Sequence, residues 1–168
     1  MTYNDVILTA IYLILGFIIA SFLEYWIHRL MHMYTWVGNK LTPHYSHHRN
    51  NEGVGVIWEF RNYCVVTVFF LPAFLISWSV GIKIICGSLI YAAFSAYAHQ
   101  LQHENPRKCF WMKMPVHYIH HKHNQWNHNF GLAVDWWDFV FGTYKAEEWP
   151  TEVELNQPEL GRFEIKWM

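Results

Sequence analysis

The sequence predicts an all-α integral membrane protein with about three transmembrane helices and a helical cap at one membrane face. Two observations predict this class: long apolar stretches without charge, and lysines and arginines gathered at one end of those stretches. Charged residues make up 15% of the chain, whereas soluble domains contain roughly 25%. The composition therefore favours a membrane protein, and we treat residues 1–168 as a single membrane-embedded domain.

The expected spans follow from three uncharged stretches at residues 6–23, 63–82 and 84–98. A transmembrane helix needs about 20 apolar residues, so the first two qualify, and the third qualifies when extended to His103. Residues 63–98 are too long for one crossing, which predicts a hairpin that turns at 79–83. Pro72 lies in its first arm, where proline kinks a helix. The expected spans are about 6–23, 63–82 and 84–103.

Positive charge predicts the orientation of these spans. Of twelve lysines and arginines, only Lys83 lies on the side of the hairpin turn, and the others lie within 29–61 or 107–166. Short loops rich in lysine and arginine stay in the cytoplasm. Residues 24–62 and 104–168 are therefore expected to be cytoplasmic, in a bacterial inner membrane or the endoplasmic reticulum.

Ten of the chain's 12 histidines form four short boxes, two with the spacing HxxxH and two with HxxHH. On a helix such residues share a face, about 5–6 Å apart at Cβ, and imidazole is the commonest protein metal ligand. The predicted topology also brings all four boxes to the cytoplasmic face. The predicted metal ligands are His28, His32, His44, His47, His48, His99, His103, His117, His120 and His121.

The boxes repeat, because an HxxxH pair followed by HxxHH occurs before the hairpin and again after it. Five nitrogens on each of two ions would leave one position open on a six-coordinate metal. The two halves could also exchange ligands, and the sequence leaves that division open. Glu24, His28 and His32 follow i, i+4 and i+8, so the first helix is expected to continue beyond the bilayer. Thr42 is expected to cap a helix that begins with Pro43.

A site built from imidazole nitrogens suits iron, zinc, copper or nickel better than magnesium or calcium. One structural zinc needs four ligands, so ten histidines predict a di-metal site in the cytoplasmic cap. At a membrane surface, two metals indicate work on a lipid. Two iron ions with dioxygen can break an unactivated C–H bond, which no acid–base side chain can do. We expect no catalytic side chain beyond the metal centre, and the chain has no nucleotide-cofactor fingerprint.

Two alternative functions stay open on the sequence. A zinc-dependent membrane hydrolase is one, although the chain has no HExxH motif and no serine or cysteine marked as a nucleophile. A non-catalytic haem-binding or metal-transporting membrane protein is the other. Haem needs fewer histidines, and a transporter places its ligands near the bilayer midplane. No nucleic-acid partner is expected, because no basic cluster of that kind is present.

Several residues near the boxes have two interpretations each. His123 and His128 lie outside the repeated pattern and are expected to be bystanders. Glu24 and Glu104 could orient an imidazole, or they could be surface charges at the membrane edge. Asn129 could be a donor beside the site or an ordinary turn residue.

Taken in order, the four boxes resemble the fatty acid hydroxylase/sterol desaturase superfamily of integral-membrane di-metal oxygenases. The segments that follow them are also similar to it: Asn-Phe-Gly at 129–131, Trp-Trp-Asp at 136–138 and Phe-Gly-Thr at 141–143. Taken alone, the Asp-Trp-Trp-Asp segment at 135–138 can equally be interpreted as a bend whose side chains serve only in packing. The resemblance covers about residues 20–145. The small size and the His-His-Arg at 47–49 also resemble short bacterial carotenoid hydroxylases.

The resemblance implies two iron ions held by the ten box histidines, with dioxygen as co-substrate. Zinc can replace iron on overexpression, since nitrogen sites bind Zn(II) more tightly than Fe(II). It also implies a lipid substrate (fatty acyl, sterol or carotenoid) that is hydroxylated or desaturated, and an external electron donor such as ferredoxin or a cytochrome b5-type protein. Many members have four spans, and a homodimer could compensate for the leading helix that is missing here.

Overall fold

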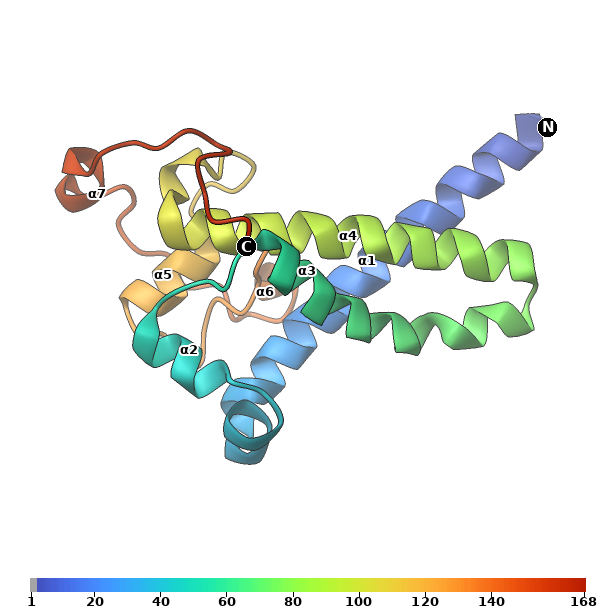
Figure 1. Ribbon diagram of the computed structural model, residues 1–168, viewed down its shortest axis with the longest axis horizontal. Helices are drawn as coiled ribbons and strands as arrows, with labels where there is room; N and C mark the ends of the chain where they lie inside the picture. The colour runs from blue at the N-terminus through green and yellow to red at the C-terminus, as the bar shows by residue number, and fades with distance from the viewer. Residues whose placement is uncertain (1–2) are drawn as a thin grey trace.

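The computed structural model describes residues 3–168, and that part of the chain contains only helices and loops (Figure 1). The predicted all-α class is therefore confirmed. The long elements are α1 (Tyr3–Met33), α3 (Val56–Tyr63) continued by η2 (Cys64–Leu75), and α4 (Trp78–Glu104). The short elements are η1 (Val37–Leu41), α2 (His44–Asn50), η3 (Pro106–Lys108), α5 (Val116–Lys122), α6 (Trp136–Val140) and α7 (Glu152–Asn156).

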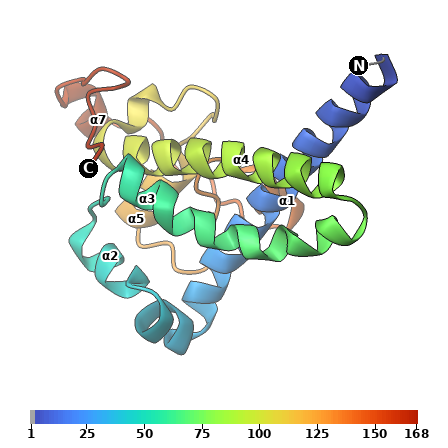
Figure 2. The same cartoon turned by 45° about the vertical axis from the view of Figure 1, so that its right-hand side comes forward.

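Three helical segments of the described chain are long and apolar enough to cross a membrane, which is the number predicted. They are Tyr3–Met33, Val56–Leu75 and Trp78–Glu104. The α3–η2 segment and α4 lie side by side as a hairpin, and α1 crosses α4 obliquely in both views (Figures 1 and 2). α1 continues without a break through His28 and His32, as the spacing from Glu24 predicted.

The hairpin turns at residues 76–77, and the predicted turn at 79–83 is wrong. Gly81, which suggested that turn, lies inside α4. Ser77 explains the difference, because its side chain accepts a hydrogen bond from the Val80 N–H at 3.1 Å while its own backbone is extended. A serine in this conformation caps a helix, so α4 begins directly after it. The second and third spans are thus corrected to 56–75 and 78–104.

Two proline positions show how the backbone adapts to a missing N–H. Pro72 lies inside η2, where the chain is wound as a 3-10 helix instead of an α-helix. Pro43 directly precedes α2, which begins one residue later than predicted, at His44. Thr42 is not its cap, because the Thr42 hydroxyl donates to the Val37 carbonyl at 3.0 Å.

Two glycines allow α1 and α4 to touch at their crossing. A Cβ on Gly16 would lie 2.1 Å from the Ile84 carbonyl oxygen, and a Cβ on Gly87 would lie 2.0 Å from the Leu13 carbonyl oxygen. Any larger residue would push the two helices apart. Small residues at helix crossings are the usual way in which membrane helices approach closely, so these positions fix the distance between the two helices that carry the HxxxH boxes.

The short helices gather at the end of the molecule opposite the hairpin turn (Figure 1). The C-terminal segment returns to this end and meets the start of α3. There the Val56 N–H donates to the Lys166 carbonyl at 3.1 Å, and the Ile57 N–H donates to the Trp167 carbonyl at 2.9 Å. These bonds satisfy helix N-terminal donors that would otherwise lack partners. All four histidine boxes therefore lie at one end of the three spans.

Candidate metal centre

Four helices bring the ten box histidines into one continuous group. α1 and α4 each contribute an HxxxH pair near their ends, and α2 and α5 each contribute an HxxHH box. Two sets of four have ring nitrogens that all lie within 4.8 Å of one another. They are His28, His32, His44 and His48 in one set, and His47, His99, His103 and His117 in the other.

The first cluster consists of the first of these sets together with His120. His44 Nε2 lies 2.7 Å from His32 Nε2, and His48 Nε2 lies 3.2 Å from the same atom. His28 Nε2 is 3.3 Å from it. His120 Nε2 lies 3.1 Å from His32 Nε2 and 3.2 Å from His48 Nε2. Five ring nitrogens from three helices thus converge around one point.

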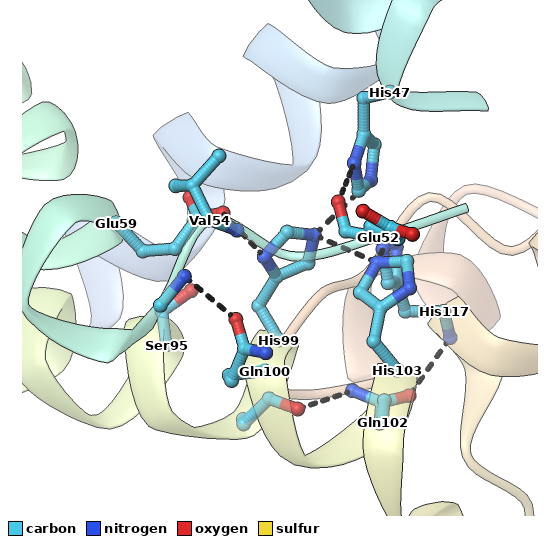
Figure 3. A network of polar contacts seen from close by, with 12 residues as sticks. His47, Glu52, Val54, Glu59, Ser95, His99, Gln100, Gln102, His103 and His117 are labelled. Carbon is cyan, nitrogen blue, oxygen red and sulfur yellow. Dashed lines mark hydrogen bonds and ion pairs between the residues drawn. The ribbon is translucent and has the colours of Figure 1, made fainter. Parts of the chain in front are cut away.

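The second cluster consists of His47, His99, His103 and His117, which Figure 3 shows from close by. His99 Nε2 lies 3.3 Å from both His47 Nε2 and His103 Nε2. His103 Nε2 lies 3.1 Å from His117 Nε2. The ring of His121 packs beside this cluster, with its centroid 4.6 Å from that of His117. Both of its ring nitrogens are buried without a hydrogen-bond partner.

The two halves of the chain exchange one histidine each. His47 lies in the second cluster, whereas His44 and His48 of the same helix α2 lie in the first. His120 lies in the first cluster, whereas His117 of the same helix α5 lies in the second. Helix geometry explains the exchange, since successive residues point about 100° apart at 3.6 residues per turn. The adjacent pairs 47–48 and 120–121 therefore cannot point at one centre. The structure thus groups the box histidines in two clusters that each combine residues from both halves of the chain.

Backbone carbonyls orient two imidazoles of the first cluster. His28 Nδ1 lies 2.6 Å from the Phe130 carbonyl oxygen, and His120 Nδ1 lies 2.7 Å from the His128 carbonyl oxygen. A carbonyl can only accept a hydrogen bond, so in each ring the proton must be on Nδ1. The lone pair is then on Nε2, the atom that faces the cluster.

A carbonyl and a carboxylate orient two imidazoles of the second cluster. His47 Nδ1 lies 3.0 Å from the Glu52 carbonyl oxygen, and His99 Nδ1 lies 3.2 Å from Glu59 Oε1 (Figure 3). Partners of this kind fix the tautomer and the orientation of a metal-binding imidazole. The sequence analysis missed Glu59, because no spacing rule connects it to a histidine box. The other partners are backbone carbonyls of residues 52, 128 and 130. Every residue has such a carbonyl, so the amino-acid types at these positions could not predict the contacts.

Burial lowers the pKa of three box histidines outside the spans, which favours their neutral form. Burial and the imidazole of His99 lower the pKa of His47 to about 4, despite its bond to the Glu52 carbonyl. Burial and the imidazole of His120 lower the pKa of His48 to about 3. Burial likewise lowers the pKa of His120 to about 4. Neutral imidazole is the form that ligates a metal.

The residues therefore fit a pair of transition-metal ions. The Nε2 atoms of His47 and His99 face each other at 3.3 Å, and both rings have an acceptor at Nδ1, so no proton lies between these two lone pairs. Such an arrangement is repulsive unless a cation occupies the centre. The donor set is imidazole only, which suits iron, zinc, copper or nickel.

Some predicted neighbours of the boxes have other roles. The Glu24 carboxyl accepts hydrogen bonds from the Leu132 N–H at 3.0 Å and from the Ser95 hydroxyl, and so it does not orient an imidazole. Glu104 likewise accepts from Gln100 Nε2 and from the Lys166 N–H. Asn129 has a left-handed backbone, φ 59°, and its side-chain amide bonds to Gln125 and to the backbone of Lys145, so it is not a donor to an imidazole.

The two histidines outside the pattern stay outside both clusters. The side chains of His123 and His128 are exposed. A residue that the sequence did not single out, Gln102, instead supports the site. Its Oε1 accepts from the His117 N–H at 3.0 Å, which holds the start of α5 against α4 (Figure 3).

A cavity of about 760 Å³ opens beside both clusters. It lies between α1, η2 and α4, and its lining is mainly apolar. A volume of this order is typical of small-molecule sites. Five box histidines form one end of the cavity: His28, His44, His47, His99 and His117. From there it runs along η2 and α4 into the spanning part of the molecule, as far as Phe70 and Ser88.

Comparison with known families agrees with this geometry. A model of the fatty acid hydroxylase family matches residues 13–143, a range that contains all ten box histidines and the cavity-lining parts of the three long segments. This confirms the resemblance drawn from the boxes. Searches among curated proteins and among solved structures found no match. The chain belongs to the fatty acid hydroxylase family.

Proposed function

We propose that the protein uses dioxygen and two iron ions to hydroxylate or desaturate a lipid. The family implies an oxidoreductase that acts on lipid. The observation that carries the proposal is the position of the two clusters, which lie at the end of an apolar cavity set between three membrane-spanning helices. A fatty acyl, sterol or carotenoid substrate would enter from the bilayer.

Two iron ions bound in the clusters would supply the two-electron chemistry with oxygen that breaks an unactivated C–H bond. The chain itself would fix the orientation of the ligand rings and keep water away from the reacting carbon. The Phe130 carbonyl and Glu59 hold the rings of His28 and His99. The apolar walls formed by η2 and α4 exclude water from the reacting carbon. The electrons would come from a separate donor, such as ferredoxin or a cytochrome b5-type protein.

Reconstitution tests the reaction class. Protein loaded with iron and supplied with a reductase system and labelled dioxygen is expected to oxidise a lipid of the host membrane. Label in a lipid alcohol would support hydroxylation, and an unlabelled alkene would support desaturation. Full activity under nitrogen with zinc alone would overturn the oxygenase proposal and favour a zinc hydrolase. One metal ion per chain, or none, would contradict the di-metal site.

We further propose that the clusters face the cytoplasm, on the basis of the lysine and arginine distribution. Ser79 lies in the first turn of α4, next to the hairpin turn, and Asn127 lies at the histidine end, and both are exposed. In a background with Cys86 replaced by serine, Ser79→Cys is expected to react with an impermeant thiol reagent in intact cells. Asn127→Cys is expected to react only after permeabilisation. Labelling of both from the same side would contradict a three-span arrangement.

A further inference from the structure

The loop at residues 128–131 presents two carbonyls to one cluster. The His128 carbonyl meets His120 Nδ1, and the Phe130 carbonyl meets His28 Nδ1. Asn129 lies between them with φ 59°, a left-handed conformation that asparagine tolerates better than most residues. A single loop therefore determines the tautomers of two first-cluster histidines that come from different helices.

Asp138 holds this loop in place. Its Oδ1 accepts from the Phe130 N–H at 2.8 Å, and its Oδ2 accepts from the Gly131 N–H at 2.8 Å. The Thr143 hydroxyl donates to Oδ1 at 2.7 Å. The side chain is fully buried, with 0% exposure. Both carboxylate oxygens are therefore used, and neither one contacts an imidazole.

The space around the loop is closed. A Cβ on Gly131 would lie 2.0 Å from the Val134 carbonyl oxygen and 3.0 Å from Asp138 Oδ2. Tyr25 closes the other side, because its hydroxyl lies 2.9 Å from Thr143 Oγ1. The peptide groups of the loop thus have one well-defined orientation, and the Phe130 carbonyl has one direction, toward His28.

We propose that Asp138 is a positioning residue for the first cluster, which acts on His28 through the Phe130 peptide. This inference rests on the proposed metal centre. A carboxylate anchors two successive N–H groups, which aims the adjoining carbonyl at His28 Nδ1 and keeps the lone pair on Nε2. The Trp-Trp-Asp segment is in this view part of the metal site, although it supplies no ligand.

The test compares Asp138→Asn with Asp135→Asn. The asparagine amide keeps the shape of the side chain, but its NH₂ must face a backbone N–H that needs an acceptor. Asp135 is the matched control, because it is an aspartate of the same segment and its side chain makes no capping hydrogen bond to α6. Both variants are purified in detergent, stripped of metal and titrated with Co(II), whose visible spectrum reports ligand geometry.

In Asp138→Asn, one of two Co(II) ions is expected to bind about 10- to 100-fold more weakly, with an altered visible spectrum. Nitrogen-15 NMR of the histidine side chains in the apoprotein is expected to show loss of the fixed Nδ1–H tautomer of His28. Asp135→Asn is expected to match wild type in both measurements. A merely structural role for Asp138 would lower the unfolding temperature and leave the tautomer and the spectrum unchanged, which would overturn the proposal.

Thr143→Val provides a milder test if Asp138→Asn does not fold. It removes one of the three hydrogen bonds to the carboxylate, so the same ion is expected to bind several-fold more weakly. Unchanged Co(II) binding in Thr143→Val would then overturn the inference. Wild-type protein that binds no metal would instead overturn the proposed function, so the two failures are distinguishable.

Discussion

The His120→Ala substitution is expected to remove one metal ion per chain and to lower lipid oxidation by about 100-fold or more. His120 Nε2 lies within 3.2 Å of two first-cluster nitrogens, so its loss opens the coordination sphere of one ion only. Changes that merely disturb a ligand's partners already cost about 10- to 100-fold. Elemental analysis after gentle purification and a product assay are the measurements.

The control for this substitution is His123→Ala, which changes an exposed side chain three residues further along the chain. It is expected to leave the metal content and the activity close to wild type. The reciprocal variant His47→Ala is expected to remove the other ion, because His47 belongs to the second cluster. A variant at position 120 that retained both ions, or damage from His123→Ala of the same size, would contradict the assignment.

The Ala92→Phe substitution is expected to lower activity by roughly 100-fold without changing metal content. Ala92 lies on α4 and lines the cavity beside Ser95, so an aromatic ring there would occupy the space in which the lipid must lie. Displacement of a substrate by about 1 Å already costs on the order of 100-fold in rate. Product formation and metal analysis, run on the same preparation, separate a blocked cavity from a damaged metal site.

Ile90→Phe is the matched control, since Ile90 lies on the same helix with 57% of its surface exposed. A ring at this position would point away from the cavity, and activity is expected to stay near wild type. If Ala92→Phe and Ile90→Phe were equally active, the cavity would not be the lipid site.

Helical spacing explains why so much of the site was predictable. The HxxxH and HxxHH spacings determine which side chains share a face, and the uncharged stretches determine where helices can cross a bilayer. The three spans and the meeting of the boxes at one end both follow from those two patterns. The turn was misplaced because Gly81 and Lys83 resemble turn residues, whereas the capping side chain of Ser77 decides where α4 starts.

The parts that escaped prediction depend on contacts between distant segments. Glu24 has helical spacing to His28, yet its carboxyl accepts from Leu132, which is far along the chain. Glu59 meets His99 only because α3 packs against α4. The carbonyls of His128 and Phe130 belong to the backbone, so the amino-acid types at these positions do not predict their contacts with the imidazoles. Residue spacing predicts which side chains share a face of one helix. It does not predict which groups of a distant segment will pack against that face.

The exchange of His47 and His120 has a consequence for biogenesis. Each cluster contains histidines from both sides of the hairpin, and each contains one from α5: His120 in the first cluster and His117 in the second. α5 follows all three candidate membrane-spanning segments in the chain, so the ribosome makes it after them. Neither cluster can be complete while the spans are being inserted. Loading of the metals is therefore expected to follow insertion, and the bound ions would then lock together segments that were synthesised far apart in time.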